Sequence, residues 1–298
     1  MKTKLITTLM ASAAMLAGAA SAQTMEDTIA AVKAHAEKVN AHLEAEGANY
    51  RLEYADILVG ADSGEEATTV FFNNRGNKQL TVQFMENDTR RVWSGGDPNT
   101  IDWTLDGVDT TSDVGVNAQQ SAIVSAMQSW DDVKCSDLGL NGSLVGQDQG
   151  YVEAIFGLGG GFFITGDLMF SGFLPGQFMG PNTLGVHYGF NFIDENRQPT
   201  DLNNDGFADK AFGDMYFNDN FRWSTDGSGV DIETVALHEA GHGLNQQHFG
   251  KGFRTEENGK LHFAPRAVMN ATYFGAFRDL KGTDKGGHCS MWAAWPNN

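Results

Sequence analysis

The chain contains the segment His238-Glu239-Ala240-Gly241-His242-Gly243-Leu244-Asn245-Gln246-Gln247-His248, which places three imidazoles and one carboxylate within eleven residues. Residues four apart lie on the same face of an α-helix, so a helix would let His238 and His242 direct ring nitrogens at one ion. His248 lies six residues beyond His242, too far round an unbroken helix to join them. The chain must therefore turn back after Gly243 or Leu244, and Gly243 and Asn245 are residues that tolerate such a turn.

The ligand set indicates zinc in a catalytic arrangement, because three protein ligands leave the fourth position open for water. Glu239 would lie beside the ion, where it could take a proton from a zinc-bound water, whose pKa the metal lowers to about 7, and pass it to a leaving amine. The alternative is that the histidines are polar residues of a helix surface and a loop. With 8 His in 298 residues, the pattern would arise from composition in only roughly three of ten thousand such chains, which favours the zinc interpretation.

The same segment resembles the signature of the metzincin metallopeptidases, H-E-x-x-H-x-x-G-x-x-H followed by a methionine turn. Asn245 replaces a glycine of that signature, and because asparagine tolerates the left-handed conformation we expect the turn to be kept. The methionine turn is similar to Ala267-Val268-Met269-Asn270-Ala271-Thr272-Tyr273. The resemblance implies that Met269 lies beneath the zinc ligands. It also implies an α/β (α+β) metzincin fold with a mixed twisted sheet, an active-site helix and a small C-terminal subdomain after His248.

Within this family the chain is most similar to the matrixins. Their M-Y-P-x-Y stretch corresponds to 269–273, and a leucine, an aspartate and a glycine follow here as Leu280, Asp284 and Gly286. Asn-Ala replaces Tyr-Pro, which affects the shape of the pocket on the primed side. Tyr273 matches the tyrosine of the pocket wall, although a half-buried aromatic side chain is the other interpretation.

A second matrixin feature is incomplete. The stretch Gly213–Asp219 is similar to the matrixin strand that carries a histidine ligand of a structural zinc, but Tyr216 stands at that position. We therefore expect no second zinc, and we expect His187 to be a hydrogen-bonded strand histidine.

The ends and the charge of the chain predict an exported protein. Residues 1–22 have the pattern of a signal peptide, with Lys2 and Lys4, an apolar run and Ala20-Ser21-Ala22 before a cleavage site at Gln23. No cysteine stands directly after that site and no later stretch has the length of a membrane helix, so we expect a soluble extracellular or periplasmic protein without a membrane anchor. Removing the two lysines takes the net charge from −18 to −20, which opposes nucleic-acid binding.

The mature chain divides into an N-terminal region, 23–97, and a catalytic domain, 98–298. Apolar residues at helical spacing predict a helix from Thr24 to about Gly47, and alternating segments at 68–72 and 79–84 predict a β-hairpin. The N-terminal region is either a propeptide that is removed or a small structural appendage. In the catalytic domain we expect a helix over about 118–133 and strands near 101–105, 151–155, 162–170 and 184–193.

Two cysteines, Cys135 and Cys289, are an even number in a protein destined for an oxidising compartment, which predicts one disulfide. A cysteine switch, in which a propeptide thiolate occupies the zinc, is the competing interpretation. The region 23–97 contains no cysteine, so latency would require another ligand there, for example a carboxylate.

Oxygen-bearing side chains alternate along Asp201-Leu202-Asn203-Asn204-Asp205-Gly206-Phe207-Ala208-Asp209. Asp201, Asn203, Asp205 and Asp209 with the carbonyl of Phe207 have the spacing of a short calcium loop, although the bidentate glutamate of an EF-hand is missing. The segment is either such a structural Ca²⁺ site or an Asp/Asn-rich turn stabilised by its own side chains.

Between His248 and Met269 the chain carries an insert that includes the charged stretch 254–260 and that we expect beside the substrate cleft. His262 and His288 are predicted to be surface or hydrogen-bonding residues, because three zinc ligands are already present. Together these patterns predict a monomeric, secreted zinc-dependent endopeptidase whose partners are protein or peptide substrates. The rival hypothesis is a non-catalytic secreted zinc- or calcium-binding protein, such as an adhesin or an inactive peptidase homologue.

Overall fold

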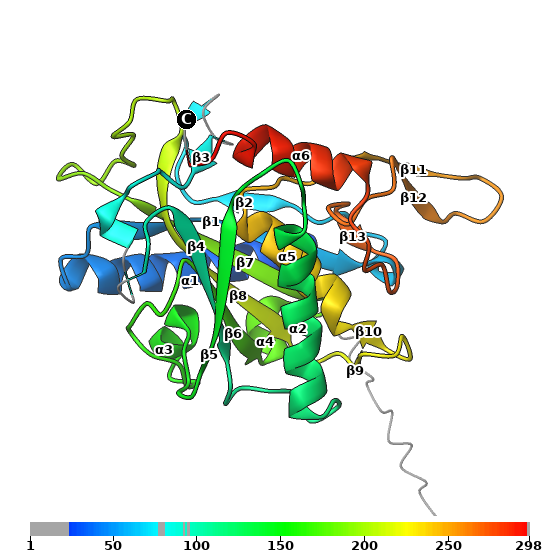
Figure 1. Cartoon of the computed structure of the whole chain (residues 1–298). Coiled ribbons are helices and arrows are strands. Elements are labelled where there is room, and N and C mark those ends of the chain that lie inside the picture. Colours follow the sequence, from blue (N-terminus) through cyan, green and yellow to red (C-terminus); the bar gives the residue numbers. More distant parts are fainter. Residues whose placement is uncertain (1–23, 77–80, 92, 94–95, 297–298) are drawn as a thin grey trace, which may run out of the picture.

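The computed structural model describes residues 24–76, 81–91, 93 and 96–296 and shows a mixed α/β fold built on one large sheet (Figure 1). The predicted signal peptide lies outside the described residues. No helix of the described part is long and apolar enough to cross a membrane.

The large sheet has the strand order β13-β1-β7-β8-β6-β4-β5 and is mixed. β4, β5, β6 and β8 run parallel to one another, whereas β7 is antiparallel to both β8 and β1. The short strand β2 pairs with β1, and the short strand β3 pairs with β8. The bounds are β1 Tyr50–Gly60, β2 Thr69–Phe71, β3 Val82–Gln83, β4 Thr100–Asp106, β5 Gly139–Val145, β6 Leu168–Leu174, β7 Thr183–Phe192, β8 Ala208–Asn218 and β13 Thr272–Tyr273.

Among the described residues six α-helices accompany the sheet: α1 Met25–Ala45, α2 Val116–Asp131, α3 Tyr151–Phe156, α4 Gly176–Met179, α5 Ile232–Gly243 and α6 Gly282–Trp292. Short 3₁₀ turns occur at Ala61–Ser63 and Thr89–Arg91. Two small two-stranded sheets pair β9 Trp223–Ser224 with β10 Val230–Asp231 and β11 Lys251–Arg254 with β12 Leu261–Ala264.

The two faces of the sheet are covered by different helices. Buried residues of α2 and α5 form one apolar cluster, and buried residues of α1 belong to another (Figure 1). Successive strand residues point to opposite faces, so in β1 the side chains of Ile57 and Val59 join the α1 cluster while Leu58 joins the α5 cluster. The sheet is therefore the middle layer of three, and β1 contributes to both cores.

Several predicted elements are confirmed. α1 begins at a capping box formed by Thr24 and Asp27, α2 covers most of the expected helix, and β4 and β7 lie where strands were expected. The N-cap of α5 is Asp231, whose side chain accepts a hydrogen bond from the Thr234 amide.

Three predictions are wrong. Residues 151–155 form helix α3, because the buried Asp214 carboxylate accepts hydrogen bonds from the Tyr151 and Val152 amides and so caps a helix N-terminus. The strand expected from 162 begins at Leu168. The hairpin does not form among the described residues, since β2 pairs with β1 and β3 pairs with β8.

The N-terminal region shares the sheet with the rest of the chain. β1, which the sequence did not lead us to expect, lies between β13 and β7, and nine of its residues pair with β7. The expected boundary at 97/98 therefore falls between segments of a single sheet.

Candidate metal centre

Helix α5 and the segment after it bring the three predicted histidines together. The Nε2 atom of His242 lies 3.0 Å from that of His238, and the Nε2 atom of His248 lies 3.2 Å from each. These three form the one group of His, Cys, Asp or Glu side chains among the described residues that could hold a metal ion. His238 and His242 have 1% of their surface exposed and are buried, whereas His248 is partly exposed.

The turn that returns His248 to the helix is made at Asn245. Its φ of 65° is in the left-handed region, as predicted. The Asn245 amide donates to the carbonyl of His242 and the Gln246 amide donates to the carbonyl of Gly241, which satisfies carbonyls at the helix end. The sequence substitution at this position therefore keeps the backbone conformation that glycine would adopt.

Hydrogen bonds fix the tautomers of two of the rings. Nδ1 of His238 lies 2.8 Å from the Val268 carbonyl, and Nδ1 of His242 lies 2.8 Å from the Gln246 carbonyl. A carbonyl only accepts, so each Nδ1 carries the proton and each Nε2 presents a lone pair. Burial lowers the pKa of His238, His242 and His248 to about 3, so the rings are neutral near pH 7.

This geometry fits a zinc ion. Lone pairs about 3 Å apart repel one another unless a cation lies between them. Tetrahedral zinc with Zn–N bonds of about 2.0–2.1 Å separates its ligand nitrogens by about 3.3 Å, close to the distances found here. The chain thus provides three neutral donors in the arrangement that zinc accepts.

Glu239 lies next to the donors but is closed off from solvent. Its exposed fraction is 0%, and neither carboxyl oxygen has a hydrogen-bond partner within the described part of the chain. Burial and the nearby Asp56 carboxylate raise its pKa well above the usual range. Burying a carboxyl group without a hydrogen-bond partner lowers the stability of the fold, so the presence of Glu239 here is better explained by a function than by stability.

Met269 lies beneath the helix that carries the ligands. A Cβ added at Gly241 would lie 2.3 Å from the Met269 sulfur, so the side chain packs against the helix backbone between His238 and His242. The buried Asp284 carboxylate accepts hydrogen bonds from the amides of Val268 and Met269. It thereby fixes the segment whose Val268 carbonyl orients the His238 ring.

Tyr273 has two contacts with the site. Its hydroxyl accepts a hydrogen bond from the Asp231 amide at the start of α5, and its ring lines a small pocket together with His238. Val268, Thr272, Phe274 and Leu58 line the same pocket. Tyr273 is thus half-buried and also forms part of a pocket wall.

A buried charge network that the sequence did not reveal lies behind His242. Asp56 of β1 bonds Nδ1 of His187 at 3.1 Å, and its Oδ2 lies 3.7 Å from Nδ1 of His242. Nζ of Lys210 donates to the carbonyls of Gly243 at 2.6 Å and His242 at 3.3 Å, and lies 3.4 Å from Nε2 of His187. In the sequence, the sign of this network is that Asp56 and Lys210 stand within otherwise apolar strands. His187 is a hydrogen-bonded strand histidine, as expected.

The five oxygen donors of the predicted calcium loop are not all gathered. Asp209 turns away, because its Oδ2 forms an ion pair with Arg90 at 2.8 Å and accepts hydrogen bonds from Thr200 and Leu202. Asp201 and Asn203 accept hydrogen bonds from loop amides, as in a turn stabilised by its own side chains. Asp209 is therefore not gathered with the other donors, and calcium binding by Asp201, Asn203, Asp205, Asp209 and the Phe207 carbonyl stays a prediction.

The disulfide between Cys135 and Cys289 is confirmed, and it joins the segment after α2 to helix α6. The insert forms the β11–β12 hairpin, which projects from the molecule and carries the exposed His262 (Figure 1). His288 is buried and stacks on Trp130, so the expectation of a surface or hydrogen-bonding residue is corrected to a core residue.

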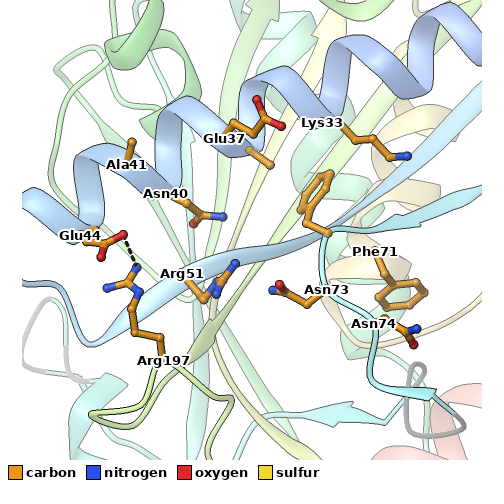
Figure 2. Close-up of a pocket in the computed structure, with 12 residues that line it drawn as sticks. Lys33, Glu37, Asn40, Ala41, Glu44, Arg51, Phe71, Asn73, Asn74 and Arg197 are labelled. Carbon is orange, nitrogen blue, oxygen red and sulfur yellow. Dashed lines mark ion pairs between the residues drawn. The ribbon is translucent and has the colours of Figure 1, made fainter.

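A separate hollow of about 770 Å³ lies along α1 (Figure 2). Lys33, Glu37, Asn40, Arg51 and Asn73 line it, and an ion pair between Glu44 and Arg197 lies at one end. None of the metal-centre residues belongs to this hollow.

None of the known protein-family models matches the chain, and no curated protein is significantly similar to it. The function therefore has to be argued from the site itself.

Proposed function

We propose that this protein is a secreted zinc-dependent endopeptidase with a metzincin-type, matrixin-like catalytic domain. The observation that carries the proposal is the convergence of three Nε2 lone pairs beside a buried carboxyl group that has no structural partner. A purely structural zinc site uses four protein ligands and has no need of Glu239.

His238, His242 and His248 would hold the zinc, which when bound supplies a Lewis acid and lowers the pKa of water to about 7. The Nδ1 hydrogen bonds to Val268 and Gln246 keep the rings in the required tautomer. Glu239 would accept the proton of the attacking water on a carboxylate oxygen and return it to the leaving amine. Met269 supports the helix from below, and Tyr273 shapes the pocket beside His238.

The metzincin assignment is supported by a helix that carries two ligands against a mixed sheet and by a chain reversal that supplies the third. The methionine beneath the helix supports it as well. The charge of −18 makes protein or peptide substrates more plausible than nucleic acid. Export, a monomeric state and structural calcium complete the proposal.

The test compares zinc content and cleavage of casein, gelatin and a peptide library, with and without a chelator, in the full chain and in a chain cut after Asn74, beyond β2. Glu239→Ala should keep one zinc per chain and lose cleavage at least about 1000-fold, since it removes the general base. Glu233→Ala is the matched control, because Glu233 lies on the same helix and outside the ligand group. Cleavage at the normal rate by Glu239→Ala would refute the mechanism. One bound zinc and no cleavage, in the full chain and in the cut chain from which residues 24–74 have been removed, would favour the non-catalytic metal-binding protein.

A further inference from the structure

Strand β1 lies in the sheet position beside the candidate metal centre. It pairs antiparallel with β7, with Leu58 opposite Gly185, and it pairs parallel with β13, with Val59 opposite Thr272. β7 and β13 both belong to the region 98–298 (Figure 1). Without β1 these two strands would border a slot one strand wide, with β7 as its open edge.

The floor of this slot is the ligand-bearing face of α5. A Cβ added at Gly185 would lie 2.5 Å from Oε1 of Glu239, so the β1–β7 ladder crosses directly above that carboxyl group. Leu58 has 2% of its surface exposed, and it lines the small pocket formed with His238 and Tyr273. The strand therefore covers the general base and places one aliphatic side chain in the neighbouring pocket.

An extended peptide binds a sheet edge by adding a strand, and the pockets beneath alternate side chains supply selectivity. β1 already makes the backbone hydrogen bonds that such a peptide would make with β7. The exposed fraction of Glu239 is 0% and those of His238 and His242 are 1%, so the general base and two of the three histidines are covered, while His248 keeps partial exposure.

We infer that β1 is an internal inhibitory strand, which occupies the peptide-binding slot between β7 and β13 and keeps the full chain inactive until the strand leaves. This inference rests on the proposed peptidase function. Inhibition occurs by occlusion and not by a zinc ligand, since Asp56, the carboxylate of β1 nearest the site, faces Nδ1 of His242 and not the three Nε2 atoms.

The slot also indicates how substrate lies. A groove of about 820 Å³ begins where β1 ends, between Gly60, Leu184 and Tyr273 on one side and the insert residues 258–261 on the other. Arg254 of the insert donates to the Gly64 carbonyl and so holds the chain that leaves β1. A substrate would run antiparallel to β7 with a leucine-sized side chain in the place of Leu58 and would extend into this groove.

The first experiment places a site-specific protease sequence after Asn74, beyond β2, in the otherwise full chain. The protein is folded, loaded with Co²⁺, and assayed before and after cutting. The probe is a hydroxamate that carries an isobutyl group, and its binding changes the visible absorption of cobalt without any need for catalysis. The intact chain should give no change and cleave no peptide. After cutting and dilution both signals should appear, and adding back the segment 24–74 should suppress them.

The second experiment needs no cutting. Leu58→Ala empties the pocket and should tighten the apparent affinity of the uncut chain for the probe by about tenfold or more. Leu52→Ala is the matched control, because Leu52 is equally buried in β1 but packs in the α1 cluster away from the site. Its effect on probe affinity should be at least severalfold smaller.

The outcomes separate the two proposals. Equal probe affinity in the wild type and Leu58→Ala, or Glu239-dependent cleavage by the intact chain at the rate of the cut chain, would overturn occlusion. Either result leaves the peptidase proposal standing. Probe binding that requires the cut or Leu58→Ala, without cleavage of any peptide, would uphold occlusion and reject the peptidase.

Discussion

The left-handed conformation of Asn245 allows a prediction in which two physical rules give opposite orders. A left-handed residue other than glycine costs about 1–2 kcal/mol, and asparagine costs less than alanine or a β-branched residue. At φ 65° backbone conformation alone therefore favours Gly over Asn, Asn over Ala and Ala over Val at this position. Helix propensity would instead rank alanine first and glycine last.

The magnitudes follow from the surroundings of the side chain. Asn245 is 8% exposed, and neither the Nδ2 nor the Oδ1 atom of its side chain has a hydrogen-bond partner. Asn245→Gly removes this unsatisfied amide, a gain of about 1–3 kcal/mol, against about 0.5–1 kcal/mol for the extra freedom of the unfolded chain. We expect Asn245→Gly to be stabilising by up to about 2 kcal/mol. Alanine and valine remove the same side-chain amide but adopt the left-handed conformation less readily, so Asn245→Ala should be less stable than Asn245→Gly by about 1 kcal/mol, and Asn245→Val should be less stable still.

The assay is urea unfolding of the metal-free variants, together with zinc affinity measured by competition with a chromophoric chelator. Because this turn places His248, the zinc affinities should follow the same order as the stabilities. An alanine variant more stable than the glycine variant would refute the argument from backbone conformation.

Three further predictions concern buried charged groups. Lys210→Met should destabilise the protein by about 3–5 kcal/mol in urea, because it removes the ammonium donor of two helix-end carbonyls, whereas the exposed Lys251→Met should cost less than about 0.5 kcal/mol. Burial lowers the pKa of His35 to about 4 in the folded protein, whereas in the unfolded chain this pKa is about 6.5. Between these values the unfolded chain binds a proton that the folded protein does not bind, so the free energy of unfolding should fall by about 3 kcal/mol from pH 6.5 to 4. His35→Gln, followed by urea midpoints across that range, should lack this share of the loss. Burial and neighbouring carboxylates raise the pKa of Glu153 to about 10, so wild-type stability should fall as pH rises from 4.5 towards 10. Glu153→Gln should remove that slope and raise stability at pH 7 by up to roughly 3 kcal/mol, and a variant less stable than the wild type at pH 9 would contradict this.

The clustering of the three histidines could be predicted because its geometry is local. The four-residue spacing of His238 and His242 is a property of any helix, and the need for a turn before His248 follows from six residues of chain. Asn245 could be assigned to that turn from its side chain alone. These features depend on neighbours in the sequence and not on the rest of the fold.

The errors arise where partners lie far apart in the sequence. The stretch 151–155 has the composition of a strand, but Asp214, some sixty residues later, supplies the cap that makes it a helix. Asp209 completes the spacing of a calcium loop, but Arg90 binds its carboxylate from the other side. Long-range hydrogen bonds overrode the local pattern in the first place and a long-range ion pair did so in the second.

β1 was missed for the same reason, and its charged residues explain how it differs from an ordinary core strand. Asp56 is fully buried, and its carboxylate accepts a hydrogen bond from His187 and attracts a proton to the buried Lys210. Removing β1 would leave Lys210 in the interior without that carboxylate, which is unfavourable in a medium of low dielectric constant. It would also expose the apolar surface that α1 and β1 share with β7. Spontaneous opening of the slot is therefore costly. A cut in the chain changes this balance, because a severed segment gains translational freedom on leaving and a substrate strand can then take its place on β7. The buried charge network behind His242 thus favours a closed state that is stable until proteolysis, over one that opens and closes by thermal motion.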